Sequence, residues 1–320
     1  MLKKIRVLLA VIMLGGMLGL FANFGAEIGK LSFLAKLQLI PNILSFNLLK
    51  CFNLFILFLW LILTCSVGRL YCSIICPLGI MQDIFSHWGA KFRSQPKFTF
   101  RYPYSKWRYA FLLLYIIAFI LNLGFIINLL SPYALFGRLA TNLVNPTAVW
   151  LNNMIASWSV ANGSSSLSQA QYFVIDWLNF SLSVVVGVFI ATIAFFFGRL
   201  YCNSICPVGT VLGLISSQAL YQIKIDRDKC IKCGLCARNC KAECIDVKSG
   251  SVDNSRCVKC FNCLETCHKE AIGFTYRYGT KQKHQIKPAT EVKKIKGRTY
   301  GTTHFPFFVW SFFIVCLRNW

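Results

Sequence analysis

Charged side chains are scarce in this sequence, and acidic ones are scarcest. Asp, Glu, Lys and Arg make up 14% of the 320 residues, whereas soluble domains average about 25%. Only 11 residues are acidic, against 34 Lys and Arg, and 56% of the chain is apolar. This composition excludes an ordinary soluble domain and predicts an integral membrane protein.

The apolar residues are concentrated in four long runs that contain no charged residue. These runs cover residues 7–24, 51–67, 109–130 and 177–197. A helix needs about 20 apolar residues to cross a bilayer, so four transmembrane helices are predicted. A shorter apolar stretch, residues 305–317, fits either a fifth span or an interfacial helix. Residues 1–24 also fit a cleaved signal peptide, which would not change the orientation of the later spans.

Basic residues flank the predicted spans unevenly. Seven Lys and Arg lie between residues 68 and 108, but Arg138 is the only one between residues 131 and 176. Basic loops stay on the cytoplasmic side of a bacterial inner membrane. The 68–108 segment and everything after residue 197 are therefore predicted to be cytoplasmic, and the 131–172 segment is predicted to be an outside loop.

The sequence also contains no motif for nucleic-acid recognition, although its formal net charge is +23. Residues 221–300 contain 18 basic and 8 acidic side chains. This excess suits anionic membrane lipid or an acidic redox protein as the partner. No nucleic-acid partner is expected.

Cysteine is abundant, with 16 residues, and half of them lie in two runs, "CIKCGLCARNC" and "CVKCFNCLETC". Both runs follow C-x-x-C-x-x-C-x-x-x-C, the ligand pattern of bacterial two-cluster ferredoxins, in which the fourth ligand comes from the other run. Cluster one would use Cys230, Cys233, Cys236 and Cys267, and cluster two would use Cys257, Cys260, Cys263 and Cys240. Disulfides conflict with a cytoplasmic location, and zinc sites use two C-x-x-C pairs with a longer gap. Two [4Fe–4S] clusters are predicted.

The usual proline after the fourth cysteine is missing from both runs, where Lys241 and His268 stand instead. An additional cysteine, Cys244, follows Cys240 by four residues. It either packs as a small apolar side chain or replaces Cys240 as a ligand.

A second cysteine motif occurs twice, as "GRLYCSIICPLG" at 68–79 and "GRLYCNSICPVG" at 198–209, with nine of twelve positions identical. The pairs Cys72/Cys76 and Cys202/Cys206 have i, i+4 spacing, which places both thiols on one helix face. The proline that follows each pair can kink or end the helix. Because each copy follows two predicted spans, the two halves are expected to be parallel repeats about an axis normal to the membrane.

That axis would bring Cys72, Cys76, Cys202 and Cys206 together on the inner face. Four thiols there would form a redox site, either by binding a further metal centre or by forming a reversible disulfide, or they would only pack. Arg69 and Arg199 are expected to snorkel to lipid phosphate or to hold a negatively charged centre. Asp83 and His87, just past the first motif, could accept protons from a quinol.

These motifs, with the two-cluster run behind them, resemble the NapH/NosR/CcoG-like membrane-bound 4Fe-4S polyferredoxins over about residues 1–275. The expected fold is an α-helical integral membrane protein with four or five transmembrane helices in two parallel repeats. A C-terminal α+β two-cluster bacterial ferredoxin-like domain follows. The predicted boundaries are 1–220 for the transmembrane domain, 221–275 for the ferredoxin domain and 276–320 for a basic tail with a short apolar end.

The resemblance implies a quinol-dehydrogenase-like electron-transfer component that connects the quinone pool with a redox protein partner. Its cofactors would be the two clusters, with quinone and a further metal centre at the repeated cysteines. One alternative is a copper, metal or thiol–disulfide reductase that acts in the maturation of a respiratory enzyme. Another is a non-catalytic membrane anchor for a redox partner.

Overall fold

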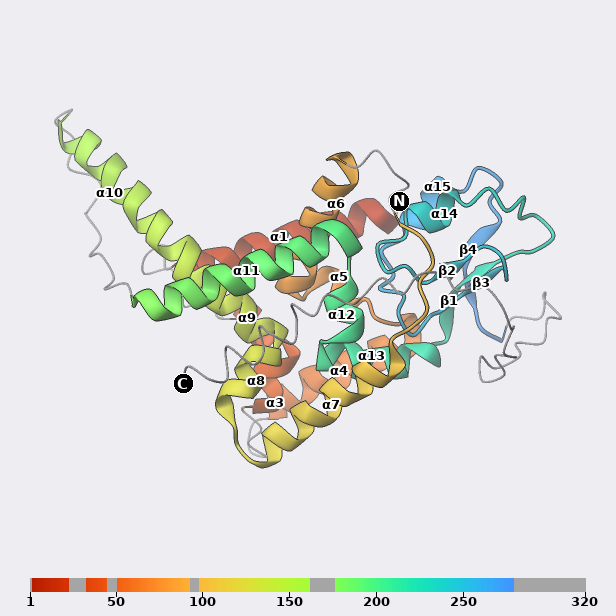
Figure 1. Ribbon diagram of the computed structural model, residues 1–320, viewed down its shortest axis with the longest axis horizontal. Helices are drawn as coiled ribbons and strands as arrows, with labels where there is room; N and C mark the ends of the chain where they lie inside the picture. Colours follow the sequence, from red (N-terminus) through yellow and green to blue (C-terminus); the bar gives the residue numbers. More distant parts are fainter. Residues whose placement is uncertain (1, 23–32, 45–50, 93–97, 162–175, 279–320) are drawn as a thin grey trace, which may run out of the picture. The chain divides into compact units, whose positions relative to one another are not determined.

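The computed structural model describes residues 2–22, 33–44, 51–92, 98–161 and 176–278. Within these ranges the chain is mostly helical, with a few short strands after residue 220 (Figure 1). The apolar stretch 305–317, for which a fifth span was one interpretation, lies outside the described residues, as does nearly all of the predicted tail.

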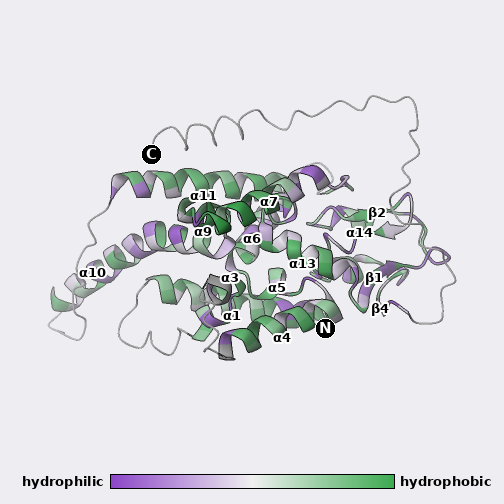
Figure 2. Ribbon diagram, turned by 90° about the horizontal axis from the view of Figure 1, so that it is seen from below, coloured by the Kyte–Doolittle hydropathy of each residue, from purple (hydrophilic) through white to green (hydrophobic). Residues whose placement is uncertain are grey.

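Four long helices cover most of the predicted spans. They are α1 (Leu2–Ala22), α4 (Cys51–Val67), α7 (Ser105–Ile120) and α11 (Trp177–Phe197). Among the described residues, two segments are long and apolar enough to cross a membrane, Leu2–Phe21 and Trp177–Phe197. Apolar side chains such as Leu8 and Val188 are exposed on them, and both helices are largely hydrophobic in Figure 2. These helices hint at membrane association, and a total of four spans stays a prediction.

The expected continuous span over residues 109–130 is wrong, because the helix is interrupted. Helix α7 ends at Ile120, and α8 (Gly124–Leu130) begins after a short turn. Asn122 in that turn has a φ of 54°, in the left-handed region. Asn enters this conformation more easily than most residues, and one such residue is enough to end a helix.

The 131–172 segment, predicted as a loop, is also helical as far as it is described. It forms α9 (Pro132–Leu139), a π-helical turn η1 (Ala140–Val144) and α10 (Asn145–Ala161). Pro132 occupies the first turn of α9, where a missing N–H costs nothing. Leu135, Phe136 and Leu139 are buried. Helix α9 therefore has a buried apolar face. The sequence predicts a loop here because the segment has few charged residues and no long apolar run.

Two short helices follow a long helix at equivalent places in each half. They are α5 (Tyr71–Ile74) and α6 (Pro77–Phe92) after α4, and α12 (Leu200–Ser204) and α13 (Pro207–Ser217) after α11. A further short helix, α3 (Leu39–Leu44), precedes α4. Helix α6 packs against α11, and its counterpart α13 packs against α4, so each half covers the long helix of the other. In the first half, α1 contacts α5 and α6. In the second half, α7 makes the equivalent contacts with α12 and α13. These exchanged contacts are those of two equivalent repeats.

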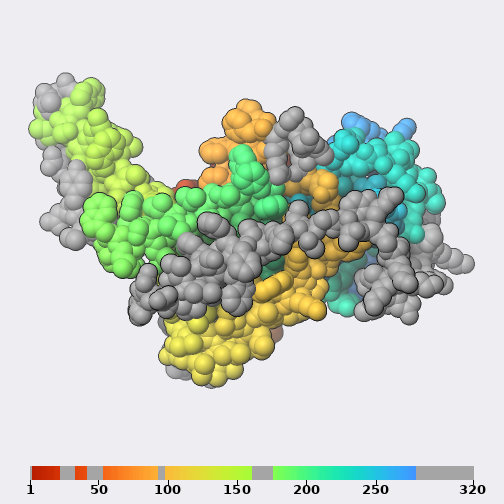
Figure 3. Space-filling model, viewed as in Figure 1, coloured from red at the N-terminus to blue at the C-terminus, as the bar shows by residue number. Residues whose placement is uncertain are grey.

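The described residues after 220 form a small α+β unit, which is coloured cyan to blue in Figure 3. Strand β1 (Tyr221–Ile225) pairs antiparallel with β4 (Ile272–Tyr276), and β2 (Ile245–Asp246) pairs with β3 (Ser251–Val252). Two short helices, α14 (Leu235–Arg238) and α15 (Asn262–Thr266), complete it. Its core mixes isoleucines with cysteines. So small an apolar core is marginal by itself and usually needs a metal or a disulfide.

The glycine that ends each repeated motif should be essential for packing. A Cβ at Gly79 would collide with the carbonyl oxygen of Cys72, and a Cβ at Gly209 would collide with that of Cys202. We expect Gly79→Ala and Gly209→Ala each to destabilise the protein by about 1–3 kcal/mol, the usual cost of overpacking. Thermal denaturation in detergent measures this. Gly124→Ala is the matched control, since its Cβ meets no atom within 4 Å, and equal midpoints for all three variants would contradict the packing.

Candidate functional site

The ferredoxin-type cysteines come together in two groups. The side chain of Cys236 lies within electrostatic range of three other thiols, those of Cys230, Cys233 and Cys267. The side chain of Cys263 lies within electrostatic range of four. Three of these, Cys240, Cys257 and Cys260, form the second group with it, and the fourth is Cys236 of the first group. Each group therefore takes three cysteines from one run and one from the other.

The loops that hold these cysteines have an unusual backbone. Lys232 and Gly234 in the first run, and Lys259 and Phe261 in the second, all have φ between 53° and 77°. Lys259 lies 27 residues after Lys232, and Phe261 lies 27 residues after Gly234, so the two pairs occupy equivalent places in the two runs. A left-handed conformation is costly for residues other than glycine and is typical of functional sites. Alternation of this conformation with helical residues turns successive N–H groups toward a bound anion, as at many iron–sulfur sites.

The second group lines a cavity with an empty volume of about 350 Å³. Its wall contains Cys240, Cys257, Cys260 and Cys263, together with apolar residues such as Ile223. In the described part of the chain, no group of three or more His, Cys, Asp or Glu side chains is arranged to hold a single metal ion. A [4Fe–4S] cluster differs, because its four thiolates bind four separate iron atoms. The donor set therefore fits a cluster better than a mononuclear zinc ion.

Cys244 is a fifth thiol in the wall of the same cavity and is 1% exposed. Its Sγ lies 3.5 Å from the Sγ of Cys240. A hydrogen bond from Cys244 lowers the pKa of Cys240, and one to Cys257 lowers the pKa of that thiol to about 6. Cys244 has a single S–H, so it is placed to donate to one of these two thiolates at a time, a more specific role than apolar packing.

The repeated motifs assemble their cysteines into a third group, the membrane-face quartet, which consists of Cys72, Cys76, Cys202 and Cys206. All four are at least 96% buried. Each thiol is within electrostatic range of the other three. Burial raises the pKa of Cys76 and of Cys206. Without a metal the thiols of Cys76 and Cys206 are therefore neutral at pH 7, and a bound metal would deprotonate them.

The end of the motif explains how the second cysteine of each pair is held. Helices α6 and α13 begin at the prolines, so Cys76 and Cys206 precede the first helical residue. The N–H of Gly209 donates to the Sγ of Cys206 at 3.4 Å, and the N–H of Gly79 donates to the thiol of Cys76. Proline fits the first helical position, and the helix N-terminus favours a negative charge. Both sulfurs are therefore placed where a thiolate is stabilised.

The arginines of the motif cross from one repeat to the other. Arg69 Nη2 donates to the carbonyl oxygen of Cys202 at 3.2 Å, and Arg199 Nη1 donates to that of Cys72 at 2.6 Å. Both side chains are 0% exposed. The expectation that they snorkel to lipid phosphate is wrong. Gly79 and Gly209 leave the space through which these guanidinium groups reach the carbonyls.

Asp83 neutralises one of the two arginines. Its carboxylate accepts from Arg199 Nε at 2.7 Å and lies 3.2 Å from both Arg6 Nη2 and Lys241 Nζ. Burial raises the pKa of Asp83, but the three cations outweigh burial and hold that pKa well below its usual range. Asp83 therefore stays ionised and does not suit the expected role of proton acceptor for a quinol.

Buried positive charge exceeds buried negative charge around these sites. Among the described residues, the buried cations are Arg6, Arg69, Arg108, Arg199, Arg256 and Lys259, and the buried acids are Asp83 and Glu243. Arg69 Nε and Arg199 Nη2 also have no hydrogen-bond partner among the described residues. A buried charge without a counter-ion is strongly destabilising. Dianionic clusters bound by four thiolates would supply the missing negative charge.

Comparison with known proteins supports the binding of iron–sulfur clusters by this chain. A family model described as "4Fe-4S binding domain" matches residues 51–96 and 178–227, which contain the two repeated motifs. A second model with the same description matches residues 223–246. No solved structure matches the chain.

Two curated relatives point in the same direction. The methylamine utilization ferredoxin-type protein MauN of Paracoccus denitrificans is 27% identical over 174 residues, which are 54% of this chain and 48% of MauN. The putative electron transport protein YccM of Escherichia coli is 34% identical over 59 residues, 18% of this chain and 16% of YccM. The chain thus covers less than half of each relative's length. It carries 4Fe-4S ferredoxin-type domains, and its homologues support an iron–sulfur electron-transfer function.

Removal of the Asp83 charge should destabilise the whole assembly. Asp83→Asn keeps the shape but leaves the buried Arg199 guanidinium without its counter-ion, a change that typically costs about 3–5 kcal/mol. We expect a large fall in the thermal midpoint and in the yield of folded protein. Glu265→Gln is the control, since Glu265 pairs with Lys3 at the surface, where an ion pair contributes little. Similar losses in both variants would contradict this prediction.

Cys244 should tune cluster two without binding it. In Cys244→Ala we expect the cluster to remain but its reduction potential to fall by tens of millivolts, because hydrogen bonds to the ligating sulfurs favour the reduced form. Redox-titrated EPR measures the potential, and iron analysis measures the occupancy. Cys240→Ala is the paired variant, which should lose the cluster. If Cys244→Ala loses it and Cys240→Ala keeps it, Cys244 is the ligand instead.

Proposed function

We propose that this protein is an iron–sulfur electron carrier of the bacterial inner membrane, with its ferredoxin-type unit on the cytoplasmic side. It relays electrons between the quinol pool and a redox partner through two [4Fe–4S] clusters and a third centre at the membrane-face quartet. The observation that carries the proposal is the set of direct contacts between the quartet motifs and the residues that flank cluster two.

Those contacts reach both sides of the cavity that cluster two would fill. Arg199 donates its backbone N–H to the carbonyl of Lys241 at 3.0 Å, directly after the ligand Cys240. Arg69 Nη1 donates to the carbonyl of Ser255 at 3.0 Å, two residues before the ligand Cys257. The same two arginines contact the quartet carbonyls. Each arginine therefore touches both sites, which supports a short path between them.

Cluster one suits the role of contact with a soluble partner. Cys233 is exposed, and Cys230, Cys236 and Cys267 are only half-buried, whereas Cys240 and Cys263 of cluster two are buried. Electrons would then pass in the order partner, cluster one, cluster two and quartet, or in reverse. The basic residues around cluster one, among them Lys229 and Lys232, favour an acidic partner surface.

A metal-bound quartet is supported by three observations. The four thiols lie together, two of them at helix N-termini. Two buried guanidinium groups with unpartnered nitrogens surround them. The matched segments 51–96 and 178–227 belong to a family model described as 4Fe-4S binding. A bound cluster supplies one-electron transfer, and the chain supplies the four sulfurs, the N–H donors and the positive charge.

Metal analysis of anaerobically purified protein tests the proposal. Three four-iron centres require about twelve iron and twelve sulfide per chain, and two centres require about eight. In Cys72→Ala/Cys202→Ala we expect a loss of about four iron, with the EPR signals of the two ferredoxin-type clusters retained. Cys65→Ala should change nothing, because Cys65 is exposed and is not part of the quartet.

The possible results separate the parts of this proposal. About eight iron in the wild type, with no loss in the double variant, would remove the third centre and leave the two-cluster relay. A disulfide within the quartet, found by thiol counting, would favour the thiol–disulfide reductase instead. The absence of any iron–sulfur EPR signal after reduction would overturn the electron-transfer function itself.

A further inference from the structure

Helix α6 places a buried side-chain amide next to the membrane-face quartet. Gln82 lies on this helix, six residues after Cys76, and is 0% exposed. The Sγ of Cys202 donates to the Oε1 of Gln82 at 3.3 Å. The contact joins the first repeat to a cysteine of the second, so Gln82 touches the quartet across the boundary between the repeats.

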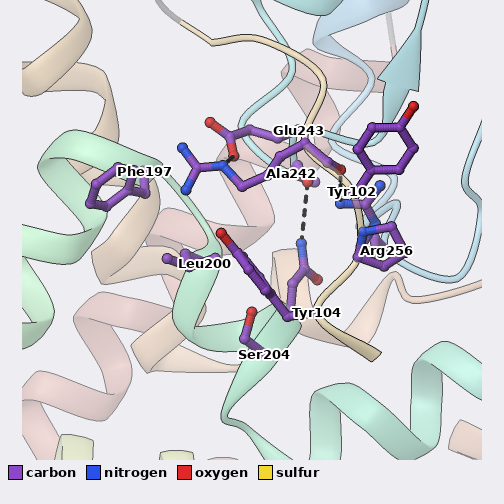
Figure 4. Close-up of a pocket in the computed structure, with 11 residues that line it drawn as sticks. Tyr102, Tyr104, Phe197, Leu200, Ser204, Ala242, Glu243 and Arg256 are labelled. Carbon is purple, nitrogen blue, oxygen red and sulfur yellow. Dashed lines mark hydrogen bonds and ion pairs between the residues drawn. The ribbon is translucent and has the colours of Figure 1, made fainter. Parts of the chain in front are cut away.

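The other half of the same amide has no partner. The Nε2 of Gln82 is buried and forms no hydrogen bond with any described residue, and a buried donor without an acceptor is costly. The amide of Asn203, directly after Cys202, differs. Its Oδ1 accepts from Arg69 Nη1 at 2.8 Å, and its Nδ2 donates to the carbonyl of Ala242 at 3.4 Å, the bond drawn at Ala242 in Figure 4. Of these two amides beside Cys202, Gln82 is the one with a donor to spare.

Metal binding changes what Cys202 needs from this amide. A neutral thiol can donate to Oε1, whereas a ligating thiolate has no proton and can only accept. A half turn of the terminal amide exchanges Oε1 and Nε2 within nearly the same volume. That rotation gives the sulfur of Cys202 an N–H donor and gives Nε2 an acceptor. The unpartnered donor of Gln82 is therefore accounted for by a thiolate at Cys202.

The second repeat has no equivalent donor. The residue 130 positions after Gln82 is Leu212, which is 2% exposed. Both repeats supply a backbone N–H to their second cysteine through the last glycine of the motif, so the side-chain donor is what differs between them. Leucine fills the equivalent place in the second repeat, and packing alone therefore does not require an amide.

We propose that Gln82 donates its amide N–H to the ligating sulfur of Cys202 and thereby raises the reduction potential of the centre at the quartet. This inference rests on the proposed function, because it needs a centre at the quartet. Reduction adds negative charge that the sulfurs share, and a hydrogen bond to a ligating sulfur stabilises that charge. Gln82 thus helps to set the potential at which the quartet exchanges electrons with cluster two.

Gln82→Leu gives the first repeat the residue of the second and tests this role. In anaerobically purified, iron-loaded protein, we expect the equilibrium constant for reduction of the quartet centre to fall about tenfold, which is about 59 mV for one electron. Redox-titrated EPR measures the potential, and the quartet signal is the one that Cys72→Ala/Cys202→Ala loses. Gln82→Met has a side chain of similar length without a donor. It should show the same fall, and it keeps the test valid if Gln82→Leu does not fold.

Gln38→Leu is the matched control, because Gln38 is a buried amide that bonds to the first motif through other groups. Its Nε2 donates to the carbonyl of Ile75 at 3.0 Å, and its Oε1 accepts from the hydroxyl of Tyr71 at 2.8 Å. This variant should lose stability and keep the potential of the quartet centre. An equal fall in the control, or the wild-type potential in both Gln82 variants, would overturn the inference.

Iron analysis of the wild type reports the proposed function separately. About twelve iron per chain with an unchanged potential in the Gln82 variants would overturn the role of Gln82 and leave the third centre in place. About eight iron, with no EPR signal lost in Cys72→Ala/Cys202→Ala, would remove the third centre and the role of Gln82 together.

Discussion

The buried, crossed arginines are the constraint on which most of this structure depends. Arg69 and Arg199 each leave one repeat and donate to the backbone of a cysteine in the other, with no exposure to solvent. Burial of two guanidinium groups costs several kcal/mol unless anions and hydrogen bonds compensate. The motif supplies that compensation through the carbonyls of Cys72 and Cys202, and its two final glycines leave the space for it. The repeats can therefore be stable only as a pair.

The same arginines connect the paired repeats to the ferredoxin-type unit. Their contacts with Lys241 and Ser255 reach the two segments that carry the predicted ligands of cluster two. A change at the quartet would therefore be transmitted to cluster two through rigid, buried groups. It also follows that loss of cluster two should weaken the paired repeats, because both sites use the same buried positive charge.

Local spacing is what made the cysteine sites predictable. Three ligands within seven residues can bind one cluster only in a tight loop, so the two runs indicate their chemistry without knowledge of the fold. The crossed arginine contacts join residues more than 120 positions apart, and no local pattern indicates such a pairing. The break at Asn122 was missed because hydropathy alone does not register a left-handed residue. Arg108 and Arg256 gave no signal, since their roles depend on loops brought together by folding.

One departure from symmetry makes the surroundings of the quartet unequal. The counterpart of Asp83 in the second repeat, 130 residues on, is Gly213. Arg199 therefore has a carboxylate beside it, whereas Arg69 forms no ion pair with any described residue. A Cβ at Gly213 would collide with the guanidinium of Arg108. Arg108 joins Arg69 at the carbonyl of Ser255. Arg69 is held by the carbonyls of Cys202 and Ser255 and by the side-chain oxygen of Asn203, whereas Arg199 is held by a carboxylate. The two halves of the quartet therefore lie in different electrostatic surroundings, although their motifs are nearly identical.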